Sequence, residues 1–505
     1  MEFAATPETA ATKGVSQRVQ PHGGALVNLV VTPERASELK ELSGNLPDVD
    51  LTDRQLSDLE LLSSGAFSPL TGYMGREDYE SVLDSLRLAD GTLWPLPVCL
   101  DLDQARAKAL EPGKAVALRD AEGFMLGVLH VEDVWAVDKK REAEALYGTC
   151  DTRHPGVERL FSETGTHYVS GKVESIQLPL HFAFRGLRHT PLEIRALFAK
   201  LGWRRVVGFH TSHPLYRAQH ESTLRAMTRA KANLLLHPAV GRVRPKDIDT
   251  YTRVRCYREL VRYYPPNMMV LSLFPYAERM AGARETLLCA LVRKNYGCTH
   301  FLVGNDHERA GTDASGQPFC TAQSVEKLLE EVGEDLGIEV LPYERLVYVA
   351  EEGAYLPEAE VPEGAGRLTL SEDEFHERLR AGKPVPEWYS FPEVVREITR
   401  SNPPRHQQGL TIFCTGLSGA GKSTIAKVLY ARFAELGRRP VTLLDGDIVR
   451  KNLSSELGFS REHRDINVRR IGFVASEITK NRGIAICAPI APYAPTRNAV
   501  RKLIK

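Results

Sequence analysis

Hydrophobic and polar positions near the end of the chain predict a strand, a loop and a helix in direct succession. The run 410–415 is mostly apolar, and apolar residues recur at helical spacing over 424–430. Between them, residues 416–423 read Gly-Leu-Ser-Gly-Ala-Gly-Lys-Ser and fit the pattern G-x-x-x-x-G-K-[S/T] at each constrained position. A Gly-rich turn with a chance lysine would lack this context, so we interpret the segment as a phosphate loop.

Such a loop binds phosphate because successive backbone N–H groups and a helix N-terminus point into one concavity. Lys422 is expected to reach the β- and γ-phosphates of ATP, and the Ser423 hydroxyl is expected to bind Mg²⁺. We therefore expect Mg²⁺ with ATP as the cofactor, and no tightly bound organic cofactor. The predicted ATP-binding residues are Gly416, Ser418, Gly419, Ala420, Gly421, Lys422, Ser423 and Thr424.

The pattern earlier in the chain predicts two further folds. Short β-type runs, such as 25–31 and 115–120, are broken by Gly and Pro turns, with a helical stretch over 76–83. After about residue 181, amphipathic helices alternate with apolar runs, which favours a parallel, Rossmann-like sheet with ligands at the carboxyl ends of its strands. The clearest of these elements are a helix over 191–198 and strands over 205–209, 268–273 and 300–304.

We therefore expect an α/β multidomain protein, because the 505 residues exceed the roughly 250 to 300 that a single core holds. Residues 311–395 are acidic and irregular, which is typical of a small subdomain and a linker. The expected domains are a mostly β domain over residues 1–180, a Rossmann-like domain over 181–325, a small α/β subdomain with a linker over 326–400, and a phosphate-loop domain over 401–505.

Composition narrows the expected partners. Lys plus Arg equals Asp plus Glu, 65 each, which argues against a general nucleic-acid or membrane-surface binder. The eight cysteines are scattered singly without the spacing of a zinc site, which favours a reducing compartment. The sequence has neither a run of about eighteen apolar residues nor a signal-like start. We expect a soluble, cytoplasmic protein with small-molecule partners, and no binding to nucleic acid or membrane.

Candidate catalytic residues follow the next predicted strand, 441–444. Asp445 and Asp447 come at its carboxyl end, where a carboxylate can take a proton from an attacking hydroxyl or hold the water shell of a metal. Asp-Gly-Asp by itself is often only a turn. At this distance from a phosphate loop we favour the catalytic interpretation.

The polar residues after Phe459 indicate a second candidate site. Arg464, Asn467 and Arg470 recur at i, i+3 and i+6, which places them along one helix face. Beside an aromatic ring they could hold an anionic nucleotide by guanidinium pairing and stacking. The alternative is a solvated charged face, which is the usual meaning of such runs.

Together these motifs resemble adenosine 5′-phosphosulfate (APS) kinase. The shared motifs are the phosphate loop, Leu-Asp-Gly-Asp-x-x-Arg, Gly-Phe-Ser-x-x-x-Arg-x-x-Asn-x-Arg-Arg and Pro-Tyr, and they cover most of residues 409–505. The resemblance implies that the 3′-hydroxyl of APS attacks the γ-phosphate of MgATP, with Asp445 as the base and Lys422 as a second catalytic residue. It also implies that APS is bound by Asp447, Arg450, Phe459, Arg464, Asn467 and Ile490.

Two features depart from the kinase pattern. Ala491 stands where the family commonly has serine, and the segment ends at Lys505, ahead of the lid and final strands that such kinases carry. Because a lid excludes water from the transfer, we expect turnover to be affected more than nucleotide binding.

The preceding residues resemble ATP sulfurylase, which makes APS and pyrophosphate from ATP and sulfate. Shared motifs include Phe-Ser-Pro-Leu-Thr-Gly-Tyr-Met at 67–74, Gly-Trp-Arg-Arg-Val-Val at 202–207 and Asn-Tyr-Gly-Cys-Thr-His-Phe at 295–301. The resemblance implies a PUA-like N-terminal domain and a Rossmann-like nucleotidyltransferase domain. It adds sulfate and pyrophosphate to ATP and APS as candidate partners, and it implies a homo-oligomer, with a dimer favoured.

The departures from this second family fall where its reaction would occur. The family pattern Gln-Thr-Arg-Asn-Pro-x-His-x-x-His reads His-Thr-Ser-His-Pro-Leu-Tyr-Arg-Ala-Gln at 210–219. The pattern Gly-Arg-Asp-His-Ala-Gly reads Gly-Asn-Asp-His-Glu-Arg-Ala-Gly at 304–311. We expect a degenerate site made of His210, Thr211, Ser212, His213, Tyr216, Gln219, Arg284, Gly304, Asn305, Asp306 and His307.

Losing one charge-stabilising group typically costs about 2.7 to 4 kcal/mol of transition-state binding, so several losses leave little rate. Three hypotheses follow: two active domains in sequence, a kinase with a dimerisation or regulatory scaffold, and a nucleotidyltransferase that acts on another oxyanion. The lost arginines favour the second hypothesis over the first. The retained Arg284, Asp306 and His307 keep all three open.

Overall fold

The computed structural model describes residues 19–241, 247–305, 310–342 and 344–504. They form two compact units, which are described separately below. The first unit runs to residue 369 and includes residues 387–397, and the second comprises residues 370–386 and 398–505. Among the described residues, no helix combines the length and the apolar composition needed to cross a membrane.

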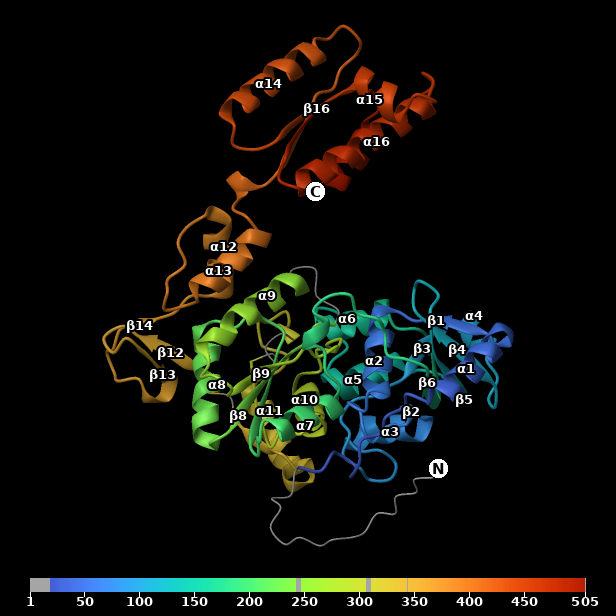
Figure 1. The fold of residues 1–505 in the computed structure, drawn as a ribbon, viewed down its shortest axis with the longest axis vertical. Coiled ribbons are helices and arrows are strands. Elements are labelled where there is room, and N and C mark those ends of the chain that lie inside the picture. Colours follow the sequence, from blue (N-terminus) through green and yellow to red (C-terminus); the bar gives the residue numbers. More distant parts are fainter. Residues whose placement is uncertain (1–18, 242–246, 306–309, 343, 505) are drawn as a thin grey trace, which may run out of the picture. The chain divides into compact units, whose positions relative to one another are not determined.

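The N-terminal domain is built on a six-stranded sheet with the order β1-β4-β5-β6-β2, in which β3 also pairs with β6 (Figure 1). Its strands are β1 (Asp48–Asp50), β2 (Gly72–Tyr73), β3 (Leu100–Leu102), β4 (Ala115–Arg119), β5 (Met125–Ala136) and β6 (His167–Ser175). Its helices are α1 (Pro33–Leu42), α2 (Asp53–Ser63), α3 (Arg76–Ser85), α4 (Gln104–Lys108), α5 (Lys139–Tyr147) and α6 (Pro155–Ser162). Helices therefore contribute more to this domain than its β-type pattern indicated.

Two of the elements expected in this domain are confirmed and one is wrong. The run 115–120 is strand β4 and the helical stretch 76–83 lies in α3. The run 25–31 is no strand and makes only an isolated bridge between Val30 and Ser175. The reason is that its N–H groups donate to different elements instead of to one neighbouring strand. Leu29 donates to Ser63 O at the end of α2, and Val31 donates to Ser175 O in β6.

The second domain is a five-stranded parallel sheet with the order β11-β10-β7-β8-β9, which confirms the Rossmann-like prediction. Its strands are β7 (Val206–Thr211), β8 (Asn233–Pro238), β9 (Met269–Leu271), β10 (His300–Leu302) and β11 (Glu339–Leu341). Its helices are α7 (Pro191–Lys200), α8 (Arg217–Ala230), α9 (Thr250–Leu260), α10 (Gly282–Asn295) and α11 (Ala322–Val332). All of β7 is buried, as expected for a parallel strand covered on both faces.

This sheet extends beyond residue 325, where the sequence placed the end of the domain, because β11 pairs with β10. A strand of three residues is too short for its periodicity to be recognised. The antiparallel sheet that follows, ordered β13-β12-β14, is formed by β12 (Leu346–Val349), β13 (Ala354–Pro357) and β14 (Arg367–Leu368). We therefore propose that the Rossmann-like domain ends after β11 rather than at residue 325.

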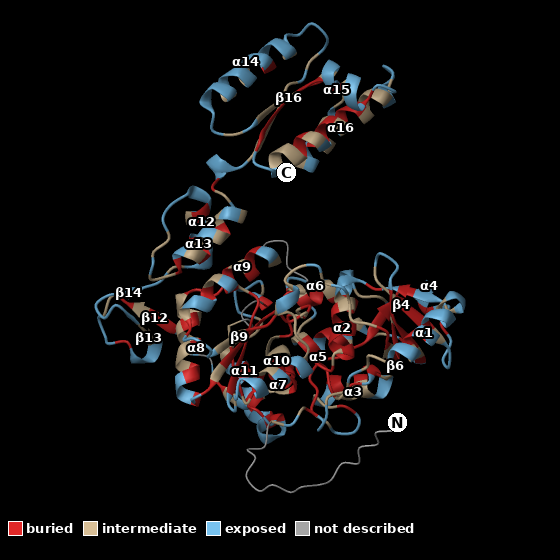
Figure 2. Cartoon of the chain, in the orientation of Figure 1, coloured by how far each residue is buried: buried red, intermediate tan, exposed pale blue. Residues whose placement is uncertain are grey.

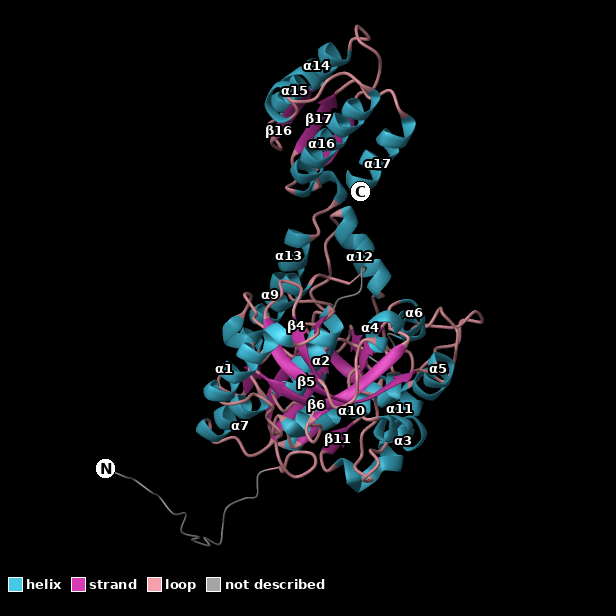
Figure 3. Cartoon of the chain, turned by 90° about the vertical axis from the view of Figure 1, so that its right-hand side faces the viewer, coloured by secondary structure: helices cyan, strands magenta, loops and turns pink. Residues whose placement is uncertain are grey.

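The second unit contains a parallel sheet with the order β15-β17-β16, and Figure 3 shows helices around it. Its strands are β15 (Leu410–Phe413), β16 (Val441–Asp445) and β17 (Ile484–Ala488), and its helices are α12 (Glu372–Ala381), α14 (Lys422–Leu436), α15 (Gly446–Leu453), α16 (Arg461–Lys480) and α17 (Ala494–Ile504). Helix α13 (Pro392–Ser401) has residues in both units. The central strand β17 is buried throughout, whereas most of α14 is exposed (Figure 2).

Short 3-10 turns complete the description. They are η1 (Ser43–Asn45), η2 (Arg185–Leu187), η3 (Val261–Tyr263), η5 (Gly333–Leu336), η6 (Glu358–Glu360) and η7 (Arg405–Gln407).

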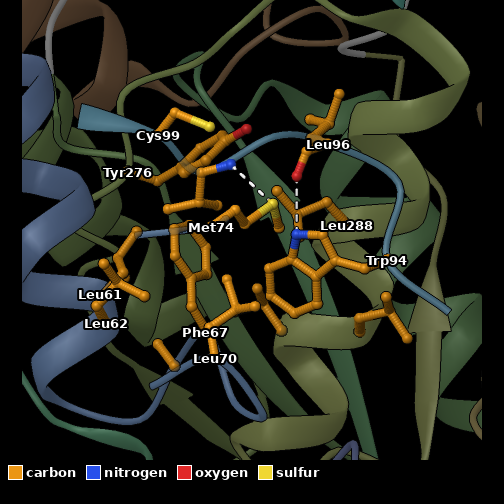
Figure 4. Packing of buried hydrophobic residues seen from close by; sticks show 14 of the residues in the cluster. Leu61, Leu62, Phe67, Leu70, Met74, Trp94, Leu96, Cys99, Tyr276 and Leu288 are labelled. Atoms are coloured by element: carbon orange, nitrogen blue, oxygen red, sulfur yellow. Dashed lines mark hydrogen bonds between the residues drawn. The ribbon is translucent and has the colours of Figure 1, made fainter. Parts of the chain in front are cut away.

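One hydrophobic core joins the first two domains (Figure 4). Trp94 is fully buried, donates its indole N–H to Leu96 O at 2.7 Å and meets Phe67 edge-on. Tyr276 and Leu288, which belong to the Rossmann-like domain, pack into the same cluster. A buried tryptophan with its N–H satisfied gains the full benefit of apolar burial, so the two domains stabilise each other.

His154 caps the N-terminus of α6 and makes stability depend on pH. Its Nδ1 accepts the N–H groups of Gly156 and Val157, and burial lowers the pKa of His154 to about 4. The ordinary pKa of histidine is about 6.5. Between pH 6.5 and pH 4, His154 therefore binds a proton in the unfolded chain but not in the folded chain, so the free energy of unfolding falls as the pH falls. We expect the melting temperature of His154→Asn, which keeps a capping acceptor, to depend less on pH than that of the wild type across this range. Equal pH dependence of the two proteins would contradict this role.

Candidate functional sites

The phosphate loop leaves β15 and enters α14, as its sequence predicts. Gly416, Gly419 and Gly421 have φ angles of 150°, 77° and 78°, a region that favours glycine. These angles let the loop turn tightly into α14, and the N-terminus of a helix favours an anion. The Lys422 ammonium donates to Leu417 O at 2.7 Å across the loop. Because that contact is on the exposed side of the loop, the ammonium can exchange it for a phosphate oxygen.

Asp445 ends strand β16 on the edge of the sheet where the phosphate loop begins. Phe413 and Leu444 both pair with Cys487, and Asp445 pairs with Ala488, so the three parallel strands finish at one level. Asp445 is 8% exposed, and its Oδ1 accepts the Asp447 N–H at 3.0 Å as the N-cap of α15. The cap holds the carboxylate at the carboxyl end of its strand, where ligands bind in such sheets.

The predicted APS residues lie on α15 and α16, in the segment between these helices that carries Phe459, and after β17. Asp447 and Arg450 are on α15, Arg464 and Asn467 are on α16, and Ile490 follows β17. Thr415 Oγ1 donates to Ala491 O at 3.1 Å, which ties the segment after β17 to the start of the phosphate loop.

Asn467 is buried, and its side-chain oxygen has no hydrogen-bond partner among the described residues. A buried acceptor without a partner costs free energy, which a substrate donor would recover. This observation is independent of the motif that predicted Asn467.

The phosphate loop and the start of α14 offer ligands of the kind that Mg²⁺ with ATP needs. Ser423 lies exposed in the first turn of α14, directly after Lys422, so its hydroxyl oxygen is open to a ligand. Hydroxyl and phosphate oxygens are the hard ligands that Mg²⁺ prefers.

In the sulfurylase-like domain, His210 near the end of β7 contacts a buried arginine that the sequence did not indicate. Arg293 of α10 has no exposed surface; its Nη2 donates to His210 Nδ1 at 2.8 Å and to His237 O at 2.9 Å. Its guanidinium lies 4.4 Å from the ring centre of Phe274. Burial, together with Arg293 and His210, holds the pKa of His237 well below its usual range. The available signal was a cation placed directly after the apolar run 287–292 of α10.

The other residues of the 210–219 motif make local structural contacts. Thr211 Oγ1 accepts the His213 N–H at 3.2 Å, and the Ser212 carbonyl accepts from Arg253. The Tyr216 ring stacks on Tyr389 with centres 4.9 Å apart. Gln219 accepts the Tyr216 N–H at 3.2 Å and so caps the start of α8.

Arg284 does not join these residues. Its guanidinium donates to the backbone carbonyls of Val82, Leu83 and Pro95 in the N-terminal domain. The contacts indicate that Arg284 ties α10 to α3 and the segment before β3. Of the remaining predicted residues, Asp306 and His307 lie outside the described residues.

Two carboxylates lie among the described residues that line the pocket at this site. It is lined by His210, Gly304 and Ala310, and also by Glu278 and Glu285; no lysine or arginine lines it among the residues that the structure describes. Glu285 accepts the Tyr276 hydroxyl and the Arg279 N–H, and burial, helped by Glu278, raises the pKa of its carboxyl group. Asn305 follows Gly304 and is half-buried.

Comparisons with known proteins match three successive parts of the chain. Residues 19–178 match a PUA-like domain, 185–401 match ATP-sulfurylase and 408–505 match adenylylsulphate kinase. The chain is 45% identical to a sulfate adenylyltransferase of Aspergillus fumigatus and 44% to one of Mycosarcoma maydis, in each case over 96% of this chain and 85% of the relative.

A solved structure described as a hexameric APS kinase from Thiobacillus denitrificans is also similar along the whole chain. It is 45% identical with a TM-score of 0.79, covering 97% of this chain and 90% of the other. The chain is therefore a transferase of the ATP sulfurylase family, in a form that fuses a PUA-like and a sulfurylase domain to a C-terminal APS kinase domain.

Proposed function

We propose that the C-terminal domain transfers the γ-phosphate of MgATP to the 3′-hydroxyl of APS. The observation that carries the proposal is the meeting of three features at one edge of the sheet: the phosphate loop after β15, Asp445 at the end of β16, and Ile490 after β17. The unpartnered oxygen of Asn467 adds a buried acceptor on α16.

In this mechanism the protein mainly positions and stabilises charge. The loop N–H groups and Lys422 bind the phosphates, and Asp445 takes the proton from the attacking hydroxyl. Mg²⁺, when bound through Ser423, neutralises charge on the phosphate oxygens. Asp447, Arg450, Phe459 and Arg464 hold the second nucleotide.

We propose that the sulfurylase-like domain is very weak with sulfate. Ser212, Tyr216 and Gln219 carry no positive charge, and the latter two are engaged in stacking and in capping α8. Arg284 is occupied by backbone carbonyls, and two glutamates line the described pocket. A scaffold role, or action on another oxyanion, are the alternatives.

The sulfurylase reaction is the direct test of this second proposal. We expect full-length protein given MgATP, sulfate and pyrophosphatase to release pyrophosphate at least about 100-fold more slowly than an active sulfate adenylyltransferase, because one lost charge-stabilising group alone has an effect of this size. Pyrophosphatase removes the pyrophosphate and the kinase domain removes the APS. The reaction therefore proceeds even though the equilibrium of APS formation from ATP and sulfate is unfavourable.

A tube without sulfate corrects for ATP hydrolysis, and a tube with APS and MgATP shows that the sample is active. Pyrophosphate release at the rate of an active sulfate adenylyltransferase would refute the degenerate site. Selenate or molybdate in place of sulfate tests the other-oxyanion alternative.

We also propose that the protein is a cytoplasmic homo-oligomer. The sequence favoured a dimer, whereas the relative from Thiobacillus denitrificans is described as hexameric. Light scattering on the eluted full-length protein distinguishes the two states.

A further inference from the structure

The segment that joins α15 to α16, residues 454–460, carries Phe459 and is here named the Phe459 loop. Arg450 of α15 donates to Leu457 O at 2.8 Å and to Gly458 O at 2.9 Å. Arg470 of α16 donates to Leu453 O at 2.7 Å and to Glu456 at 2.6 Å. The two arginines therefore hold the end of α15, the Glu456 side chain and the carbonyls of Leu457 and Gly458.

His463 holds the second half of the Phe459 loop. Ser460 is the N-cap of α16, and its Oγ accepts the His463 N–H at 3.2 Å. In return, the His463 Nδ1 accepts the Gly458 N–H at 2.8 Å. This arrangement resembles a capping box, but the side chain reaches past the N-cap and spans the residue before it, which is Phe459. Since Nδ1 accepts, the imidazole carries its proton on Nε2.

The Phe459 ring itself has little packing to hold it. It is 73% exposed, and its described partner is the Arg450 guanidinium, 4.6 Å from the ring centre. An exposed ring would otherwise sample several rotamers, and ordering it on binding costs free energy. Both neighbours of Phe459 are hydrogen-bonded to His463, Gly458 through its backbone N–H and Ser460 through its side-chain Oγ.

We propose that His463 is a positioning residue for APS. It holds the Phe459 ring, before APS binds, in the orientation in which the ring stacks on the nucleotide base. The inference rests on the proposed kinase function and adds a residue that no kinase motif in the sequence singled out. Its chemistry is specific: the position needs an acceptor that reaches the Gly458 N–H, and the imidazole supplies one. ATP binds at the phosphate loop, so its affinity does not depend on His463.

The test compares His463→Ala with His463→Asn in the full-length protein. Asn places its Oδ1 at the same bond separation from Cβ as Nδ1 of histidine, so it can restore the acceptor. Glu462→Ala, an exposed neighbour in the same helical turn, is the matched control. APS affinity and the affinity of a non-hydrolysable ATP analogue are measured by calorimetry, and KM and kcat for APS are measured by PAPS formation.

For His463→Ala we expect APS affinity to fall and KM for APS to rise by about 3- to 10-fold, the size of one hydrogen bond. The affinity of the ATP analogue should stay within about twofold, and His463→Asn should recover most of the APS affinity. Equal loss of APS and ATP affinity, or no loss of APS affinity, would refute the positioning role. Failure of the wild type to bind APS would instead refute the kinase proposal on which it rests.

Discussion

Asp445→Asn is expected to lower the rate of APS phosphorylation by about 100- to 10,000-fold, the range that a positioned general base contributes. Asparagine cannot take the proton from the 3′-hydroxyl of APS. It can still accept the Asp447 N–H, because Asn and Asp are equally good N-caps, so α15 should remain in place. The measurement is PAPS formation at saturating MgATP and APS, with ATP-analogue affinity determined on the same sample.

The matched control is Asp103→Asn, a second N-cap aspartate, whose Oδ1 accepts the Arg106 N–H at the start of α4 in the N-terminal domain. Asp103→Asn should leave the rate of PAPS formation and the affinity for the ATP analogue unchanged. Wild-type turnover by Asp445→Asn would exclude Asp445 as the base.

Lys422→Met is expected to reduce turnover by about 100- to 1,000-fold and also to weaken binding of the ATP analogue. Methionine keeps an unbranched side chain of similar length but cannot neutralise the β- and γ-phosphates. Within the described residues the Lys422 ammonium donates to Leu417 O in an exposed position, so its loss should cost little stability. Turnover and analogue affinity are measured as for Asp445→Asn.

Lys427→Met provides the control on the same helix, because Lys427 is exposed and lies beyond the loop. We expect this variant to retain both activity and affinity. Unchanged turnover in Lys422→Met would mean that the loop does not hold the reacting phosphate. A loss shared by both variants would indicate an effect on α14 rather than on the site.

Much of the kinase site could be predicted because its parts are close in sequence. The loop, its glycines and Lys422 lie within eight consecutive residues, and strand, loop and helix follow in order. Asp445 was placed by the rule that carboxyl ends of parallel strands share one edge. Local patterns therefore specify this site almost completely.

The sulfurylase-like site could not be predicted in the same way. Sequence indicated which charged residues were missing, but not what the retained ones contact. Arg284 looked like a retained site residue, yet its guanidinium binds carbonyls of Val82, Leu83 and Pro95, about 190 to 200 residues away in sequence. Arg293 was overlooked because it lies on helix α10 whereas its partners, His210 and His237, lie on strands β7 and β8.

The sequence by itself determined the order of the domains, the phosphate loop and the candidate base, since each depends on local periodicity and on short motifs. Tertiary structure alone decided which cations are available to a ligand. Folding assigns the Arg284 guanidinium to backbone carbonyls and Arg293 Nη2 to an imidazole and a carbonyl, so neither cation can bind a substrate without giving up these contacts. It likewise decided that Phe459 is held from both sides, because Arg450 and His463 approach the Phe459 loop from two different helices.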